Sequence, residues 1–391
     1  MSPKHFRQLL CLGLLPLACG PGPLPPENPK TQPDTPAPVI SVQVDPARHA
    51  PSASVATPSA PETPKTIVIK DVGLETPESV LYLPDSDVYL VSNINGGPTV
   101  VDNNGFISRV GSDGSVQNLK FIAGGQASVE LDAPKGMAVV GDTLFVADIA
   151  QVRRFDVTTG AAKGSLRFPK ATFLNDIAAD ATGSLYVTDS GLKAGPSGLL
   201  PTGTDAIYKI NGEKVTVFAK GTTLAGPNGI RTEGDTVLVV TNGKNLLTRF
   251  DAKGKVVATA ELPAGTLDGL VVLPGSRYLV SSWASKSVYV GSFSGGFTVA
   301  ASDLPSPADF DWNPKQHVLA VPGFLASDLQ LVPFTLPEVP VAAAPTGVQP
   351  AADAVQKPGA AVLKPAAQPA PAASATAPSA AAAPASKTPS P

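Results

Sequence analysis

The sequence predicts an all-β protein, a six-bladed β-propeller with disordered N- and C-terminal flanks. Three observations predict it. Residues 20–65 and 337–391 hold 25 of the 42 prolines in this chain of 391 residues. Residues 66–336 repeat one strand pattern six times, and no segment among them has the 3.6-residue apolar period of a long helix. This central region is long enough to bury one core.

Residues 1–18 have the features of an export signal. Lys4 and Arg7 precede an apolar run that ends at Ala18, and this run is shorter than the ~20 residues that a membrane-spanning helix needs. The run leads into Cys19 in a context that resembles the bacterial lipoprotein signal, except that Pro16 replaces the usual Leu, Val or Ile. The resemblance implies a lipid on Cys19. An ordinary secretory signal is the alternative.

The residue after Cys19 bears on the location that this resemblance implies. Gly20 is not the aspartate that retains lipoproteins at the inner membrane. We therefore expect an exported protein at the outer membrane or in the periplasm of a Gram-negative bacterium, attached to the membrane through the lipid on Cys19 only.

Two flanking segments are too rich in proline to fold. Residues 19–65 are expected to form a disordered, extended linker, because they cannot bury enough apolar surface to form a core. Residues 337–391 are rich in Ala and Pro, and proline recurs too often there for a long alanine helix. We expect the first segment to act as a tether and the second to be a disordered tail.

The composition excludes several classes of chemistry. A net charge of -3 leaves no basic excess for binding nucleic acid. Both cysteines, Cys11 and Cys19, lie before the repeats, so the central region has no thiol nucleophile, disulfide or thiolate metal site. His317 is the only histidine of residues 66–336. Catalysis would therefore depend on carboxylates, amides, hydroxyls or a hard metal ion. The protein is expected to be a monomer that binds a small molecule.

The six copies begin with a short motif of proline or leucine, a second residue that is polar in all but the last copy, and a small or acidic residue. Their second positions are separated by 57, 40, 53, 40 and 40 residues. The motifs are Pro77-Glu78-Ser79, Pro134-Lys135-Gly136, Leu174-Asn175-Asp176, Pro227-Asn228-Gly229, Leu267-Asp268-Gly269 and Pro307-Ala308-Asp309.

Each motif is followed by a polar turn, a second strand such as Leu185-Tyr186-Val187, and further strands. These hairpin signals give units of the size of a propeller blade. The sixth unit lacks an outer strand, whereas Thr66–Lys70 precedes the first unit without a partner. We expect this N-terminal strand to complete the sixth blade, which would leave no open seam. A pair of β-sandwiches is the alternative architecture.

Equivalent positions of the innermost strands meet at one mouth of the central channel in a propeller. The second motif positions read Glu78, Lys135, Asn175, Asn228, Asp268 and Ala308. The ends of the second strands return to the same face and add acids such as Asp148 and Asp189. Carboxylate and amide oxygens suit a hard divalent cation. The alternative is that these Asp and Asn side chains cap strand starts by accepting backbone hydrogen bonds.

The motifs around Glu78, Asn175, Asn228 and Asp268 resemble those of the regucalcin and gluconolactonase family (senescence marker protein type). The resemblance covers most of residues 66–336 and implies a six-bladed propeller that hydrolyses lactones with a divalent metal. It implies Glu78, Asn228 and Asp268 as metal ligands, Asp268 also as the general base, and Asn175 as a contact for water or substrate. Ca²⁺ is the expected metal, with Mg²⁺, Mn²⁺ or Zn²⁺ as alternatives.

Two positions depart from the family pattern. Phe173 stands where family lactonases carry an arginine just before the first Asn. Lys135 is the second departure, and it would bind an anionic substrate or pair with Glu78 or Asp268 and displace the metal. Residues 190–200 are loop-like and are expected to form a lid at the same mouth.

Three functions follow in order of preference. A metal-dependent lactonase-like hydrolase comes first, and a non-catalytic ligand-binding or scaffold propeller of the cell envelope is the alternative. A lyase that uses His317 as its base is the least favoured, because that residue is predicted to lie in a hairpin away from the mouth.

Overall fold

A computed structural model describes residues 65–336, and in this range every regular element other than one short 3₁₀ helix is a β-strand. No helix of the described range is long and apolar enough to cross a membrane. The predictions for the export signal, Cys19, the linker of residues 19–65 and the tail of residues 337–391 lie outside the described residues, apart from Lys65. The described range matches the region that the repeats predict as the propeller.

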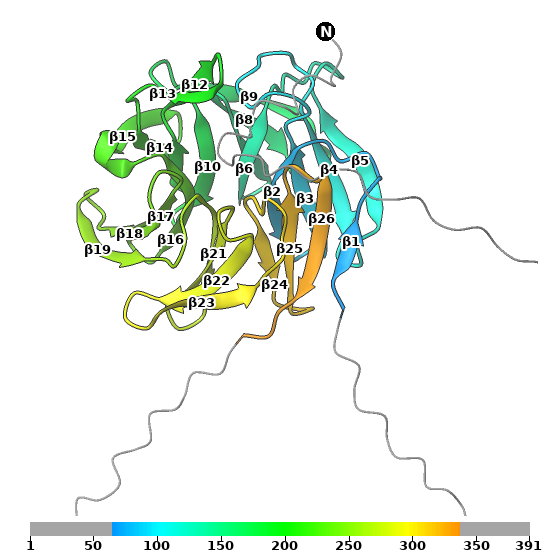
Figure 1. The fold of residues 1–391 in the computed structure, drawn as a ribbon. Helices are drawn as coiled ribbons and strands as arrows, with labels where there is room; N and C mark the ends of the chain where they lie inside the picture. The colour runs from blue at the N-terminus through cyan, green and yellow to red at the C-terminus, as the bar shows by residue number, and fades with distance from the viewer. Residues whose placement is uncertain (1–64, 337–391) are drawn as a thin grey trace, which may run out of the picture. The chain divides into compact units, whose positions relative to one another are not determined.

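Six four-stranded antiparallel sheets are arranged in a ring (Figure 1). The strands of the first three sheets, from the innermost outward, are β2 (Pro77–Leu83), β3 (Val88–Asn93), β4 (Phe106–Gly111) and β5 (Val116–Ala123), then β6 (Pro134–Val140), β7 (Thr143–Asp148), β8 (Gln151–Asp156) and β9 (Ala162–Arg167), then β10 (Leu174–Ala179), β11 (Leu185–Asp189), β14 (Ala206–Asn211) and β15 (Lys214–Lys220).

The remaining three sheets follow the same plan. Their strands are β16 (Pro227–Glu233), β17 (Thr236–Thr241), β18 (Leu246–Phe250) and β19 (Val256–Glu261), then β20 (Leu267–Leu273), β21 (Arg277–Ser282), β22 (Ser287–Ser292) and β23 (Gly296–Ala301), then β24 (Asp311–Asn313), β25 (Val318–Gly323), β26 (Asp328–Pro333) and β1 (Ile67–Ile69). The prediction of a six-bladed β-propeller is confirmed, and the sandwich alternative is excluded.

Two sets of contacts close the ring between its first and last blades. Strand β1 pairs antiparallel with β26, with Ile67 opposite Leu331 and Ile69 opposite Leu329, so the N-terminal strand completes the sixth blade as predicted. At the axis, the backbone N–H of Val80 donates to the carbonyl of Asp309 at 3.1 Å, and Asp309 N–H donates to the carbonyl of Glu78 at 3.0 Å. The closed ring leaves no unpaired seam between these blades.

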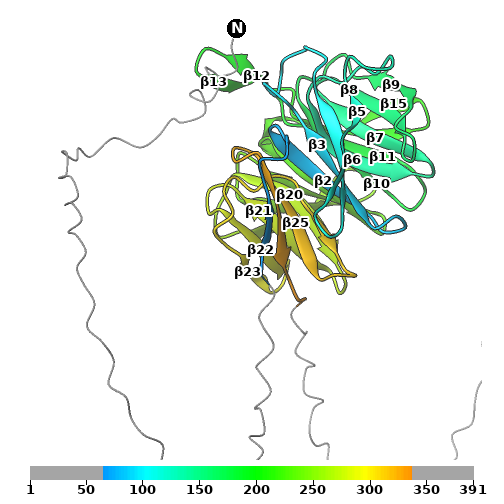
Figure 2. The ribbon, with the colours of Figure 1, turned by 90° about the vertical axis from the view of Figure 1, so that its right-hand side faces the viewer.

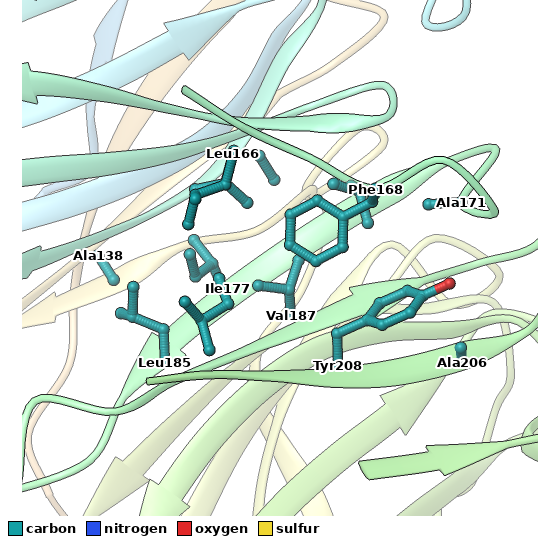
Figure 3. Close-up of a cluster of buried hydrophobic side chains, with 13 residues drawn as sticks. Ala138, Leu166, Phe168, Ala171, Ile177, Leu185, Val187, Ala206 and Tyr208 are labelled. Atoms are coloured by element: carbon teal, nitrogen blue, oxygen red, sulfur yellow. The ribbon is translucent and has the colours of Figure 1, made fainter. Parts of the chain in front are cut away.

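The core lies between neighbouring blades and consists of apolar side chains from both. The cluster between blades two and three contains Ile177, Val187 and Phe168, all at most 2% exposed (Figure 3). The ring of Phe168 meets that of Tyr208 edge to face, with centroids 5.1 Å apart. Because the sheets are covered on both faces, their strands carry apolar residues on both sides, as the near-continuous burial of β11 illustrates.

Replacement of Ile69 by alanine tests the closure of the ring. Ile69 is 7% exposed and packs into the cluster shared by blades one and six. We expect a loss of about 2–4 kcal/mol in the free energy of unfolding, because a buried isoleucine is truncated. Its neighbour Val68 is 46% exposed, so Val68→Ala is the matched control and should change stability little. Urea unfolding measures both, and equal effects of the two variants would contradict this account.

Candidate functional site at one mouth of the channel

The side chains predicted to converge lie at irregularities where the inner strands begin. In the first five blades, the register between the innermost and second strands shifts within the motif, as it does between Pro77 and Ser79 or between Leu267 and Leu270. A bulge at this point leaves the second residue of the motif outside the regular ladder and re-aims its side chain. The sixth blade differs, because Ala308 precedes the short strand β24.

Hydroxyl groups on the second strands fix three of these irregularities. Each accepts a hydrogen bond from the backbone N–H of the third motif residue: Ser79 to Ser92 Oγ at 3.0 Å, Asp176 to Thr188 Oγ1 at 2.9 Å and Gly269 to Ser281 Oγ at 2.7 Å. Two of them also donate to a carbonyl of the next blade: Thr188 to Asn228 at 2.8 Å and Ser281 to Ala308 at 2.9 Å. The motif backbone is therefore held by its own blade and by its neighbour.

The two carboxylates of the motif set are buried and incompletely bonded. Glu78 and Asp268 are each 6% exposed, and Glu78 Oε2 and Asp268 Oδ1 have no hydrogen-bond partner. Burial, followed by the charge of Asp268, raises the pKa of Glu78 well above its ordinary value. Burial raises the pKa of Asp268 to about 7. An uncompensated buried carboxylate is costly, so this pair favours a cation beside its free oxygens.

Trp283 holds the other oxygen of Asp268. Its indole Nε1–H donates to Asp268 Oδ2 at 2.7 Å, and its ring packs against Phe324 with centroids 5.1 Å apart. Both aromatic residues directly follow the ends of second strands, so they lie on the mouth side of blades five and six. Neither residue belongs to the repeated motifs from which the site was predicted. A large aromatic residue just after a second strand, next to a motif with an acidic second position, is the signal that could have found Trp283.

The two asparagines donate hydrogen bonds through their amide nitrogens. Asn228 Nδ2 donates to the carbonyl of Leu267 at 3.2 Å, and the side chain of Asn228 also lowers the pKa of Asp268 through a hydrogen bond. Asn175 Nδ2 donates to Ser190 Oγ at 3.0 Å. An amide that donates in this way presents its oxygen as the atom for a cation or a ligand. Asn228 and Asp268 are therefore adjacent, as the predicted metal set requires.

Lys135 is fully buried but forms no ion pair with the motif carboxylates. Its Nζ donates to the carbonyl of Ala133 at 2.9 Å and lies 4.6 Å from the centre of the Phe173 ring. The ion pairs within 4.0 Å among residues 65–336 do not include it. Burial lowers its pKa, and the charge of Glu78 acts in the opposite sense. The ammonium therefore acts on Glu78 without forming an ion pair with it.

The acids at the ends of the second strands have structural partners. Asp148 binds the guanidinium of Arg153 at 2.8 Å and accepts backbone hydrogen bonds from Asp132 and Ala133. Asp189 accepts the backbone N–H of Phe173 at 2.9 Å. These two residues lie on the mouth side as predicted, but they behave as the capping alternative requires.

A second polar layer, which was not predicted from the sequence, lies one residue further along the inner strands. Asp176 Oδ2 accepts from Arg231 Nη1 at 2.8 Å, and Asp309 Oδ1 lies 3.4 Å from Arg231 Nη2. Burial raises the pKa of both carboxyls. The third motif positions would have indicated this layer. Aspartate stands at this position in blades three and six, and in each case the preceding blade, two or five, has glycine there. A Cβ on Gly136 would lie 2.1 Å from Asp176 Oδ1, so the glycine makes room for the acid.

Residues 190–200 form a β-hairpin and not the loop that was predicted. Strands β12 (Leu192–Gly195) and β13 (Gly198–Pro201) pair with each other only and project from the ring (Figure 2). The hairpin follows the end of β11, on the mouth side, and Ser190 at its base bonds Asn175. It carries the exposed side chains of Leu199 and Leu200.

His317 lies at the turn between β24 and β25, with a positive φ of 55°. This turn is at the opposite end of blade six from Ala308, and His317 contributes with Phe334 to the lining of a separate surface pocket. Its predicted placement away from the mouth is confirmed, so the site contains no histidine.

The donors present fit a hard cation, although they are few. Among residues 65–336, no group of three or more His, Cys, Asp or Glu side chains is arranged to hold a metal ion. The predicted set has two carboxylates and takes its third ligand from the Asn228 amide. Two free carboxylate oxygens, at Glu78 and Asp268, provide the negative charge that a divalent ion requires.

Fold and site together define a closed six-bladed β-propeller with a buried carboxylate and amide cluster at one channel mouth. No family model matches the chain, and no curated protein matches it in sequence. Among solved structures, its fold is similar to that of a gluconolactonase from Xanthomonas campestris, with a TM-score of 0.52, 19% identity, and coverage of 67% of this chain and 87% of that chain. It is also similar to virginiamycin B lyase from Staphylococcus aureus, with a TM-score of 0.50, 11% identity, and coverage of 68% and 97% respectively.

At these identities the similarity concerns the fold. It confirms that the propeller resembles that of a gluconolactonase, as the motifs imply. The same architecture is also present in a lyase, so the fold does not select between the two chemistries.

Proposed function

We propose that this protein is a metal-dependent hydrolase of the lactonase type, with a divalent cation, Ca²⁺ in the first place, held by Glu78, Asn228 and Asp268. The observation that carries the proposal is the pair of free, buried carboxylate oxygens at Glu78 and Asp268. Their uncompensated charge is stabilised by a cation, and the neighbouring Asn228 amide supplies a neutral oxygen. The fold similarity to a gluconolactonase supports the proposed lactonase-type function.

The residues of the mouth can perform the steps of a lactone opening. A bound divalent cation supplies polarisation of the lactone carbonyl and a lower pKa for a water molecule. Asp268 accepts a proton from the attacking water while the water oxygen bonds to the carbonyl carbon. The ring C–O bond then breaks, and the same proton passes to the departing oxygen. Trp283 fixes the orientation of Asp268 through Oδ2, and Asn175 orients the water or the substrate.

Metal titration followed by a lactone assay tests this proposal. Isothermal titration of the purified chain with Ca²⁺, Mg²⁺, Mn²⁺ and Zn²⁺ should show one site per chain, and chelation should remove lactone hydrolysis. Glu78→Gln should weaken metal binding at least tenfold, because one of the two charges is lost. Absence of metal binding would overturn the proposal.

The second candidate is a non-catalytic ligand-binding or scaffold propeller of the cell envelope. The position of Phe173 favours it, because no arginine is present there for sugar-lactone recognition. Metal binding at one site without turnover of any lactone would select this function.

We also propose export and lipid attachment at Cys19, supported by the signal-like residues 1–18 and by Gly20. Mass spectrometry of the membrane fraction should find the mature N-terminus at a diacylated Cys19. Cys19→Ala should move the protein to the soluble fraction. Retention of the variant in the membrane would contradict the attachment by lipid only.

A further inference from the structure

The channel has a second open end, opposite to the mouth that carries Glu78 and Asp268. A cavity of about 350 Å³ lies there and is lined by residues from the later parts of the inner strands. All six blades contribute, and the partly exposed lining residues include Leu81, Val139, Ala179, Arg231, Val272 and Asp311. The motif carboxylates do not line this cavity, so it is distinct from the candidate metal site.

Apolar side chains form most of the wall of this cavity. Leu81, Val139, Ala179 and Val272 come from four different blades and are the partly exposed apolar residues of this lining. The cavity volume is at the lower end of the range of small-molecule sites, about 300–1,000 Å³. The dimensions and the lining therefore suit the apolar body of a small organic molecule.

Asp311 is the fixed polar group of the cavity. Its Oδ2 accepts the backbone N–H of Tyr82 at 2.9 Å, and its Oδ1 accepts that of Trp312 at 2.8 Å. These two bonds hold the carboxylate in place, and each of its oxygens retains a further lone pair. Asp311 therefore presents a positioned acceptor to a ligand in the cavity.

The other charged group of the cavity is already neutralised. Arg231 is paired with Asp176 at 2.8 Å and with Asp309 at 3.4 Å. Asp311 is a third carboxyl group that interacts with this guanidinium, and burial raises the pKa of all three carboxyls because one cation compensates them only in part. A second cation beside Asp311 would stabilise the ionised form of this carboxyl, whereas an anionic ligand would not.

We propose that this cavity binds a small organic ammonium ion with an apolar body. The ammonium group hydrogen-bonds to Asp311, and the apolar body packs between Leu81, Val139 and Val272. A neutral analogue lacks the positive charge and should bind more weakly. A carboxylate of the same shape carries a negative charge and should not bind. The proposal concerns the opposite end of the channel from the lactonase site and does not depend on that function.

Binding of 2-phenylethylammonium to the purified full chain tests the proposal, with 2-phenylethanol and 3-phenylpropionate as matched probes. Calorimetry at low salt should give an affinity for the ammonium at least tenfold above that for the alcohol, and no binding of the carboxylate. Equal binding of the three probes, or no binding of the ammonium, would overturn the proposal.

Three variants locate the site. Asp311→Asn should weaken ammonium binding at least tenfold, because the charge is lost while one acceptor oxygen remains. Ala179→Leu should abolish binding by filling the cavity, and it leaves every charged group in place. Asp235→Asn removes an exposed carboxylate from the turn after β16 at the same end of the ring, and it should bind as the wild type does. If Asp311→Asn does not fold, Ala179→Leu decides alone, and unchanged binding by that variant refutes the site.

Discussion

Replacement of Asp268 by asparagine is expected to lower lactone turnover by about 10³-fold, because general-base catalysis contributes roughly 10²–10⁴ and the amide cannot accept the proton. The variant also loses one of the two charges that would hold the metal. Trp283 can still donate to the remaining carbonyl oxygen, so the side chain should keep its orientation. Initial rates over a range of metal concentrations measure the effect, because saturation separates lost metal binding from lost proton transfer.

The control for this variant is Asp303→Asn. Asp303 is an exposed carboxylate on the segment that leads from β23 to the sixth motif, so its replacement removes the same charge near the same mouth. Its turnover should stay within twofold of the wild type. Full activity of Asp268→Asn at saturating metal would exclude Asp268 as the base.

The same substitution has a pH signature in the metal-free protein. Because the pKa of Asp268 is raised to about 7, the folded state retains a proton that the unfolded state releases near pH 4. The wild type should therefore lose stability relative to Asp268→Asn as pH rises from 4 to 7, by roughly 2–4 kcal/mol in total. Above pH 7 the difference should stay constant. Urea unfolding with chelator present measures it, and a pH-independent difference would contradict the raised pKa.

Replacement of Arg231 by methionine is expected to destabilise the fold by about 3–5 kcal/mol, because it leaves buried carboxylates without their cation. The side chain of Arg231 is 20% exposed, and its partners Asp176 and Asp309 are 2% and 5% exposed. Double replacement of these partners by asparagine in the Arg231→Met background should recover part of the loss. Chemical unfolding at neutral pH gives the free energy of unfolding of the wild type, of Arg231→Met and of the variant with all three replacements.

Arg154→Met is the matched control. Arg154 is exposed to a similar extent, 22%, but its partner Glu213 is 72% exposed, so this surface pair should contribute about 0–1 kcal/mol. A loss for Arg231→Met no larger than that of Arg154→Met would show that the central charges are solvated and do not need the guanidinium.

The repeat in the sequence was sufficient to predict the blades and the end of the inner strands at which the motif residues lie. The repeated motif placed Glu78, Asn175, Asn228 and Asp268 at equivalent positions of their inner strands, and a closed ring brings equivalent positions close together. The N-terminal strand was assigned to the sixth blade because both ends of the repeat were incomplete. These predictions depended on local patterns that recur every 40 to 57 residues.

Other features of the site depend on side-chain contacts that the repeat does not encode. Arg231 lies 55 residues from Asp176 and 78 from Asp309 in sequence, and no local pattern pairs them. Lys135 occupies the same motif position as Glu78, yet its ammonium is directed to the Ala133 carbonyl and the Phe173 ring. The indole of Trp283 reaches Asp268 from the end of the next strand. Each of these outcomes is set by the distance between side chains of different strands.

The sequence by itself determined the number of blades, the closure by the first strand, and the residue types that face one mouth, because backbone periodicity is encoded locally. The tertiary structure decided which of those residues are paired, which oxygens remain free, and where the opposite end of the channel opens. The physical reason is that hydrogen bonds and ion pairs require separations of about 3 Å, and only the assembled ring sets such separations between blades that are distant in the chain.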